Sequence, residues 1–369
     1  MKLRYIKILI LSSLLSIFMV ATATSQGEWI DYTGNPVLEP GPSGWDVYMI
    51  ADPSVLYENG VYMMWFHGHP YEGSHARIGV ANSTDGVNWT KYSGNPIIAS
   101  SRPWEESHVY LMSVIKDNGV YKMWYTGRSY LGAKIGFANS TDGFSWTKYV
   151  GGPVLDAGLG VSWDSKHVAE PSVIKEGSTY KMWYRGQNGT ISQIGYATSP
   201  DGLNWTKYAG NPILQIGSPG ALDSLGVGAP SVIKEPGEYK MWYTVNNGSI
   251  TRICYATSPD GILWTKHADN PALQKSGMNV ASPTVIRVNS TYKMWYSQGT
   301  GSPSVREISY AYTQADVGGL NIPIDKLELL TPYIALAIVL IAVITLSTYS
   351  WKHWQAKSAT QRTENTQTT

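Results

Sequence analysis

Two acids at matching places of a repeated sequence are the residues best suited to do chemistry in this chain. Asp52 and Glu170 each directly precede a proline and a short apolar run, in DPSVL and EPSVI. They lie 118 residues apart, which is twice the 59-residue period of the repeat. A pair of carboxylates facing one cavity can cleave a glycosidic bond, because one protonates the leaving oxygen while the other activates water.

The same place carries no acid in the other copies of the repeat. The five equivalent residues, in chain order, are Asp52, Leu111, Glu170, Ala229 and Ser282. A side chain that only capped the start of a strand by binding backbone amides would be equally useful in every copy. We therefore favour a chemical role for Asp52 and Glu170, and strand capping is the alternative.

The elements that would position these acids come from a repeat that fills most of the chain. Its most regular residue is the Trp of MWY or MWF, and the successive spacings are 59, 59, 59 and 53 residues, at Trp65, Trp124, Trp183, Trp242 and Trp295. The units around these tryptophans are named repeats 1 to 5. A period of this length with several short strands per unit is typical of a β-propeller, whose innermost strands surround a central axis. We predict an all-β, five-bladed β-propeller of four-stranded blades over residues 29–312.

Each repeat contains four strand patterns. In repeat 3 they are PSVIK, YKMWY, IGYATS and WTKY, and an Asp-Gly hairpin signal precedes the last. Repeat 5 ends at Tyr312 without a WTKY strand, whereas residues 29–38 contain the matching WIDY and GNP. We predict that this N-terminal strand closes the last blade, because closure removes an open sheet edge.

Further polar residues break the symmetry of the repeat near the same expected mouth of the axis. They are His67, His69, His108, Arg128, His167 and Arg185. Imidazole and guanidinium donors beside two carboxylates would bind sugar hydroxyls or an anion, so these are candidate substrate-binding residues. Solvated loop residues are the alternative. His67, His69 and His75 match no fixed metal-ligand spacing, and we expect neither a metal ion nor a cofactor.

Three tryptophans recur with the same period and are each followed by an acid. Trp45, Trp104 and Trp163 are 59 residues apart. Their recurrence favours packing of the loops at the mouth. The alternative is an aromatic platform on which sugar rings stack, which would make them substrate-binding residues as well.

The motifs together resemble a known group of enzymes. Asp52-Pro53, Glu170-Pro171 and the repeated KMWYTG and ATSPDG are similar to the five-bladed arabinanase, levansucrase and invertase propellers of glycoside hydrolase families 43 and 32, to which mannoside phosphorylases are related in shape. The resemblance spans residues 29–312 and implies that Asp52 and Glu170 are catalytic. In the inverting arabinanase-like branch they would be general base and general acid, and in the invertase-like branch Asp52 would be a nucleophile. Both branches carry a third Asp in blade two, where this chain has Leu111 and only Glu105 or Glu106 nearby.

Both ends of the chain carry apolar segments. Residues 1–23 combine basic residues, an apolar run and an Ala-Thr-Ala site, which is typical of a secretory signal peptide, with an uncleaved anchor as the alternative. After a stalk at 313–330, residues 331–351 are long and apolar enough for a transmembrane helix. The basic tail at 352–369 indicates a cytoplasmic C-terminus. We expect a single-pass protein of the cell membrane with the propeller outside the cell.

Composition narrows the possible partners. The 28 Lys and Arg nearly balance the 27 Asp and Glu, so no basic excess indicates nucleic acid, and the single cysteine, Cys254, excludes an internal disulfide. We expect a carbohydrate partner. The leading interpretation is a glycoside hydrolase that cleaves poly- or oligosaccharides by a two-carboxylate, inverting mechanism. A glycan phosphorylase that holds phosphate with its basic residues and a non-catalytic carbohydrate-binding or adhesion propeller are the alternatives.

Overall fold

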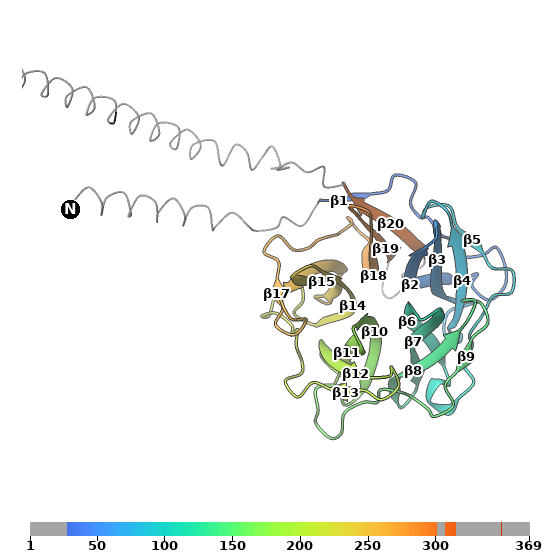
Figure 1. Ribbon diagram of the computed structural model, residues 1–369, viewed down its shortest axis with the longest axis horizontal. Coiled ribbons are helices and arrows are strands. Elements are labelled where there is room, and N and C mark those ends of the chain that lie inside the picture. Colours follow the sequence, from blue (N-terminus) through green and yellow to red (C-terminus); the bar gives the residue numbers. More distant parts are fainter. Residues whose placement is uncertain (1–27, 301–306, 315–347, 349–369) are drawn as a thin grey trace, which may run out of the picture. The chain divides into compact units, whose positions relative to one another are not determined.

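The described part of the chain is built almost wholly from β-strands (Figure 1). The computed structural model describes residues 28–300, residues 307–314 and Thr348, and the described strands all lie in the first of two compact units, residues 1–315. One 3-10 helix, η1 (Pro103–Glu105), interrupts them. The predicted all-β class is therefore confirmed.

The two apolar segments near the ends of the chain, at 1–23 and 331–351, are not part of the described strands. Within the described residues, no helix has the length and apolar character needed to cross a membrane. The predicted signal peptide, stalk, transmembrane helix and cytoplasmic tail lie outside the described residues, apart from Thr313 and Gln314 at the start of the stalk and Thr348 in the predicted transmembrane segment.

Each repeat forms one antiparallel group of four strands. Repeat 1 forms β2 (Met49–Glu58), β3 (Val61–His69), β4 (Arg77–Ser83) and β5 (Thr90–Lys91); repeat 2 forms β6 (His108–Asp117), β7 (Val120–Ser129), β8 (Gly132–Ser140) and β9 (Thr147–Lys148). Repeat 3 forms β10 (His167–Glu176), β11 (Thr179–Gln187), β12 (Ser192–Ser199) and β13 (Thr206–Lys207); repeat 4 forms β14 (Gly226–Glu235), β15 (Glu238–Asn246), β16 (Thr251–Ser258) and β17 (Thr265–Lys266). Repeat 5 forms β18 (Asn279–Val288), β19 (Thr291–Gly299) and β20 (Glu307–Thr313), to which β1 (Trp29–Asp31) is added.

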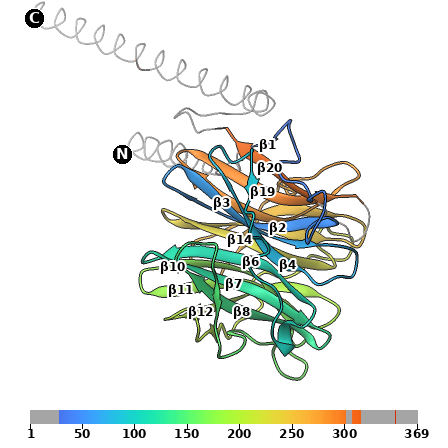
Figure 2. The same cartoon turned by 90° about the vertical axis from the view of Figure 1, so that its right-hand side faces the viewer.

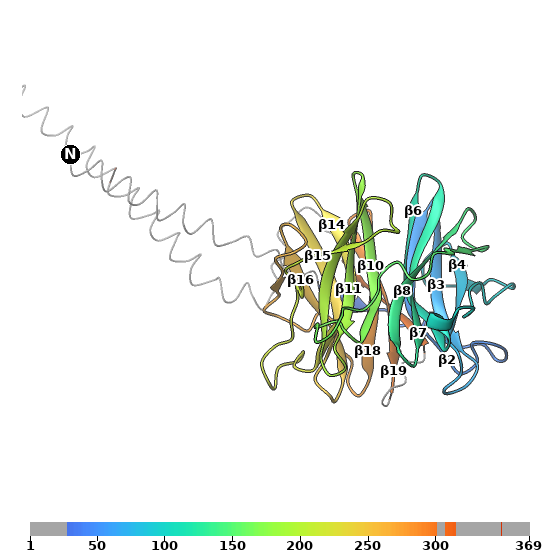
Figure 3. The same ribbon diagram turned by 90° about the horizontal axis from the view of Figure 1, so that it is seen from below.

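The first strands of the repeats surround a common centre (Figure 1). A serine in the first strand of repeats 1 to 4 accepts a hydrogen bond from the backbone of the next repeat, for example Ser54 Oγ from Val114 N at 3.1 Å and Ser113 Oγ from Val173 N at 3.0 Å. Contacts between β18 and β2 join repeat 5 to repeat 1. Figures 2 and 3, which view the molecule from the side, show the strand groups packed against their neighbours.

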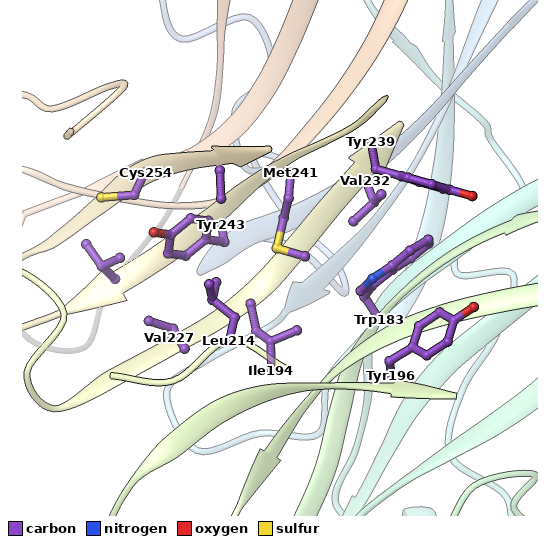
Figure 4. Packing of buried hydrophobic residues seen from close by; sticks show 12 residues of the cluster. Trp183, Ile194, Tyr196, Leu214, Val227, Val232, Tyr239, Met241, Tyr243 and Cys254 are labelled. Atoms are coloured by element: carbon purple, nitrogen blue, oxygen red, sulfur yellow. The ribbon is translucent and has the colours of Figure 1, made fainter. Parts of the chain in front are cut away.

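The hydrophobic core lies between successive repeats. Trp183 and Ile194 of repeat 3 pack against Met241 and Tyr243 of repeat 4, as Figure 4 shows. The Trp of repeats 1, 2, 3 and 5 reaches forward to a hairpin of the next repeat, and Trp183 Nε1 donates to Gly261 O at 2.8 Å. In repeat 4, Trp242 Nε1 has no such partner among the described residues. Adjacent repeats are thus joined by apolar burial together with buried hydrogen bonds.

The N-terminal strand completes repeat 5, as the sequence predicts. Trp29 pairs with Thr313 in the register of β1 and β20. Asn35 donates to Tyr310 O at 2.8 Å and accepts from Tyr310 N at 2.7 Å, which are the bonds that Asn95 makes with Val80 in repeat 1. The GNP segment therefore fastens a strand from the opposite end of the sequence into the last group.

Candidate functional site

A small central cavity brings the two predicted catalytic acids together. Three consecutive residues of each first strand line it, and those of repeats 1 and 3 begin with Asp52 and Glu170. Their side chains are each 12% exposed. Both carboxylates therefore border one small space that solvent reaches.

A β-bulge turns the residue before the conserved proline position toward this cavity. The backbone at this place has positive φ in every repeat, with values of 55°, 43°, 56°, 42° and 50° at Asp52, Leu111, Glu170, Ala229 and Ser282. The ladder between the first and second strands shifts here, for example between Ala51 and Ser54. A bulge bends the strand and re-aims a side chain. Because it occurs in all five repeats, the bulge belongs to the scaffold, and only the side chains placed on it differ.

Each bulge leaves a backbone amide that needs an acceptor outside the ladder. In three repeats a hydroxyl of the preceding repeat accepts it. The pairs are Asp52 N to Ser297 Oγ at 2.8 Å, Glu170 N to Thr126 Oγ1 at 2.9 Å and Ser282 N to Thr244 Oγ1 at 2.9 Å. His67 and Arg185 occupy this hydroxyl position in repeats 1 and 3, so these two residues replace a structural hydroxyl with a group that can pair with a carboxylate.

Asp52 is paired with His67 of the same repeat. His67 Nδ1 lies 2.9 Å from Asp52 Oδ2, and the His67 side chain is only 6% exposed. A buried imidazole beside a carboxylate fixes the orientation of that carboxylate. The candidate base and its partner are thus adjacent.

Glu170 has a protein partner at both oxygens, an ion pair at one and a hydrogen bond at the other. Arg185 Nε lies 2.6 Å from Oε1, and Ala229 N donates to Oε2 at 2.6 Å. Glu170 therefore both caps the next bulge, as the alternative interpretation expects, and forms an ion pair beside the cavity. Gly228 makes room for this pair, because a Cβ at that position would lie 2.6 Å from Glu170 Oε2 and 2.7 Å from Arg185 Cδ.

Three further histidines border the site in the neutral form. The pKa of His69, His108 and His167 is lowered to about 4. Burial is the main cause, and neighbouring positive charges contribute. Backbone donors Ala76 N and Ala133 N bind the Nδ1 atoms of His108 and His167 at 3.1 and 3.0 Å. The proton of each ring is therefore on Nε2, which makes both rings hydrogen-bond donors there.

Arg128 is the most accessible of the predicted basic residues. It is exposed, pairs in register with His108, and forms no ion pair with any residue that the structure describes. Its guanidinium is available to a ligand at the rim. Among the described residues no group of three or more His, Cys, Asp or Glu is arranged to hold a metal ion.

The recurring tryptophans pack against the sheets. A Cβ on Gly68 or Gly79 would lie within 3 Å of Trp45, and Trp104 and Trp163 cover the equivalent glycines of repeats 2 and 3 in the same way. The acid that follows each Trp binds a lysine of the fourth strand, as Asp46 binds Lys91 at 2.5 Å. These contacts favour the packing interpretation over a sugar-stacking platform.

The acid expected in repeat 2 has no substitute at Glu105. That side chain is fully buried and is bound to Lys148 and Tyr125. It belongs to the same recurring acid–lysine pairs as Asp46. Glu106 is exposed next to it.

Tyr110 is a site residue that the sequence analysis missed. It directly precedes Leu111, and its ring lies 5.9 Å from those of both His67 and His108. Burial raises the pKa of its phenol, and Arg185, Arg128, Glu170 and Asp52 all act on it electrostatically. The equivalent residues of the other repeats are small, namely Ala51, Ala169, Gly228 and Ala281. This break in the pattern was visible one position before the acids.

Comparisons with known proteins agree with this architecture. Residues 45–215 match the model of the glycosyl hydrolases family 32 N-terminal domain. Over 230 residues the chain is 25% identical to a 1,2-β-oligomannan phosphorylase of Thermoanaerobacter sp. strain X514, which covers 59% of this chain and 72% of that protein.

Solved structures of glycan-processing enzymes have a similar fold. A β-1,2-mannobiose phosphorylase from Listeria innocua, in complex with β-1,2-mannobiose, superposes with a TM-score of 0.62 at 15% identity, over 77% of this chain and 96% of its own. A structure from a study of mannoside phosphorylases and of glycoside hydrolases that target β-1,2-mannosidic linkages in Candida mannan gives a TM-score of 0.64 at 16% identity, over 79% and 94% of the two chains.

The chain thus has the propeller-like fold of glycoside hydrolases and mannoside phosphorylases, and the predicted resemblance is confirmed. At these identities the solved structures establish the fold alone, and the activity has to be argued from the site.

Proposed function

We propose that the chain is a five-bladed β-propeller enzyme that binds a glycan at the mouth of the central cavity and cleaves a glycosidic bond with Asp52 and Glu170. The observation that carries this proposal is that both acids border one cavity and that each is paired with a residue, His67 or Arg185, that replaces a structural hydroxyl. Because these replacements occur in the two repeats with an acid, the acids and their partners form matched sets.

Hydrolysis at this site requires two proton transfers. Glu170, in its protonated form, gives its proton to the leaving oxygen as the bond between that oxygen and the anomeric carbon breaks. Asp52 takes a proton from the water whose oxygen forms the new bond to the anomeric carbon. The contacts of Arg185 and Ala229 N with Glu170 stabilise the carboxylate that remains after proton transfer. Solvent exchange then returns one proton to Glu170 and removes one from Asp52.

Phosphorolysis is the second candidate, and the basic rim favours it. Arg128 and the Nε2–H groups of His108 and His167 are donors that an inorganic phosphate would need. Phosphate would then take the place of water, and one of its oxygens would form the new bond to the anomeric carbon. Sequence similarity to a 1,2-β-oligomannan phosphorylase supports testing β-1,2-mannosides first.

A carbohydrate-binding protein without turnover is the third candidate. Leu111 stands where the resembling enzymes carry a third acid, and both Glu170 oxygens are engaged by protein donors. Such a protein would bind a glycan in the same cavity and leave it intact.

A screen of purified protein separates the candidates. The full-length chain is incubated with manno-, arabino- and fructo-oligosaccharides, with and without inorganic phosphate, and released sugars, sugar phosphates and binding are measured. Asp52→Asn and Glu170→Gln should each lower turnover about 10²- to 10⁴-fold with the melting temperature unchanged. The controls Glu58→Gln and Glu176→Gln remove acids at the other ends of β2 and β10 and should retain activity. Turnover that survives the double variant D52N/E170Q would refute the assignment.

We also propose that the propeller lies outside the cell and is anchored by residues 331–351. The support is the length and apolar character of this segment and the basic residues that follow it. Protease added to intact cells should degrade the propeller and leave a tag after Thr369 protected. Protection of the propeller instead would contradict this topology.

A further inference from the structure

The residues directly before the five bulged positions form a layer around the centre, and all but one of them are small. Four repeats carry Ala51, Ala169, Gly228 and Ala281, and repeat 2 carries Tyr110. The opposite residues across the ladder are His67, Thr126, Arg185, Thr244 and Ser297. One large polar side chain therefore enters the layer from each of repeats 1, 2 and 3, namely His67, Tyr110 and Arg185, whereas repeats 4 and 5 contribute only small ones. Small residues in the other repeats make room for these side chains, as Gly228 does for Arg185.

Packing of the fold does not require a ring at Tyr110. The neighbouring Val109 is fully buried in the core of repeat 2, and strand alternation places Tyr110 on the other face of β6. The other repeats form the same bulge with a methyl group or a hydrogen at this position. The ring of Tyr110 instead contacts the imidazoles of His67 and His108 in edge-to-face geometry.

Among the residues that the structure describes, the hydroxyl of Tyr110 has no hydrogen-bond partner, and it is not one of their buried unpaired polar atoms, so it is accessible. A hydroxyl that is accessible and has no protein partner can bind a ligand. Burial raises the pKa of this phenol, so the hydroxyl keeps its proton at neutral pH. It is a neutral donor in a site that contains both carboxylates.

From this placement, and building on the proposed function, we propose that Tyr110 binds the substrate, its hydroxyl donating a hydrogen bond to a hydroxyl or ring oxygen of the sugar held between Asp52 and Glu170. Repeat 2 thereby contributes a neutral donor where the resembling enzymes place a third carboxylate. A phenol can orient the sugar and stabilise charge on its oxygen, but it cannot act as an ionised acid at neutral pH. The site would thus work with two acids and a positioning hydroxyl.

The test compares Tyr110→Phe with the wild type on glycans that the wild type binds. Removal of the hydroxyl should weaken binding, or lower kcat/KM, about 10-fold or more, because the sugar oxygen loses its partner in a desolvated site. The melting temperature should not change. Tyr57→Phe is the matched control, since Tyr57 lies on β2 at the end of the strand away from Asp52 and is 44% exposed.

Deoxy sugars distinguish a contact with substrate from a structural effect. The wild type should discriminate against the one deoxy analogue that lacks the contacted oxygen, and Tyr110→Phe should lose that discrimination while keeping the discrimination at the other positions. If Tyr110→Phe equals the wild type on every glycan that the wild type binds, the role of Tyr110 is refuted and the proposed function stands. If the wild type binds no glycan of the manno-, arabino- and fructo-oligosaccharide panel, the proposed function fails and this inference fails with it.

Discussion

Substitution of Gly228 by Ala should damage the site without unfolding the protein. Gly228 lies beneath the Glu170–Arg185 pair, and an added Cβ would lie 2.6 Å from Glu170 Oε2 and 2.7 Å from Arg185 Cδ. Non-bonded heavy atoms prefer separations of about 3.5 to 4.0 Å, so the pair has to move by about 1 Å. The displaced atoms are the ends of flexible side chains, which can shift while the backbone stays in place.

The expected magnitudes follow from this displacement. Misplacement of a catalytic group by about 1 Å costs on the order of 10²-fold in rate, which corresponds to about 2.7 kcal/mol of transition-state stabilisation. Replacement of Gly by Ala at a compatible backbone position stabilises the folded state by about 0.4 to 1 kcal/mol, which offsets part of the strain. Gly228→Ala should therefore lower kcat/KM about 100-fold and change the melting temperature by only a few degrees.

The assay is a double-mutant cycle with Arg185→Ala, read out by glycan binding and by turnover under the conditions in which the wild type is active. In the Arg185→Ala background, Gly228→Ala should have a smaller effect than in the wild type, because one of the two displaced side chains is gone. A crystal structure of G228A would show whether the contact of 2.6 Å between Arg185 Nε and Glu170 Oε1 has moved. Unchanged kcat/KM together with a displaced pair would show that this pair has no part in function.

Two further predictions concern stability. Trp29→Ala should lower the free energy of unfolding by about 3 to 5 kcal/mol, because it removes a buried ring that packs on Trp242 and anchors β1 to repeat 5. Deletion of residues 29–38 should lower the melting temperature further. If the truncated and intact chains melt at the same temperature, β1 does not close the last strand group. Stability should also fall as the pH drops from about 6.5 toward 4. The unfolded histidines bind protons below their ordinary pKa of 6.5, whereas His69, His108 and His167 in the folded protein remain neutral down to about 4. Urea titrations at pH 7, 5.5 and 4.5 measure how the free energy of unfolding depends on pH. The double variant His108→Gln/His167→Gln should reduce this dependence, and an unchanged dependence would contradict neutral burial of these two rings.

Much of the architecture was predictable because each repeat folds by local pairing. The antiparallel neighbours within a repeat are consecutive in the chain, so their apolar alternation and Asp-Gly turns carry the information for the strand group. The closing strand was predictable for the same reason, since WIDY and GNP repeat the fourth-strand sequence at the other end of the chain. The unequal positions Asp52 and Glu170 were also visible, because a repeat makes every exception stand out.

The chemistry of the candidate site was decided by contacts between repeats. The packing of consecutive repeats sets Ala229 N against Glu170, which is 59 residues earlier, and Tyr110 among residues of repeats 1 and 3. No local pattern encodes which side chain enters a shared centre, since that depends on the angle at which successive strand groups pack and on the bulge that turns each residue inward. The neutral state of His108 and His167 likewise follows from burial between repeats. The sequence by itself determined the repeat, its strands and the residues that depart from it, whereas the tertiary structure decided their partners, because the bulge aims each side chain and the packing of neighbouring repeats brings further groups against it.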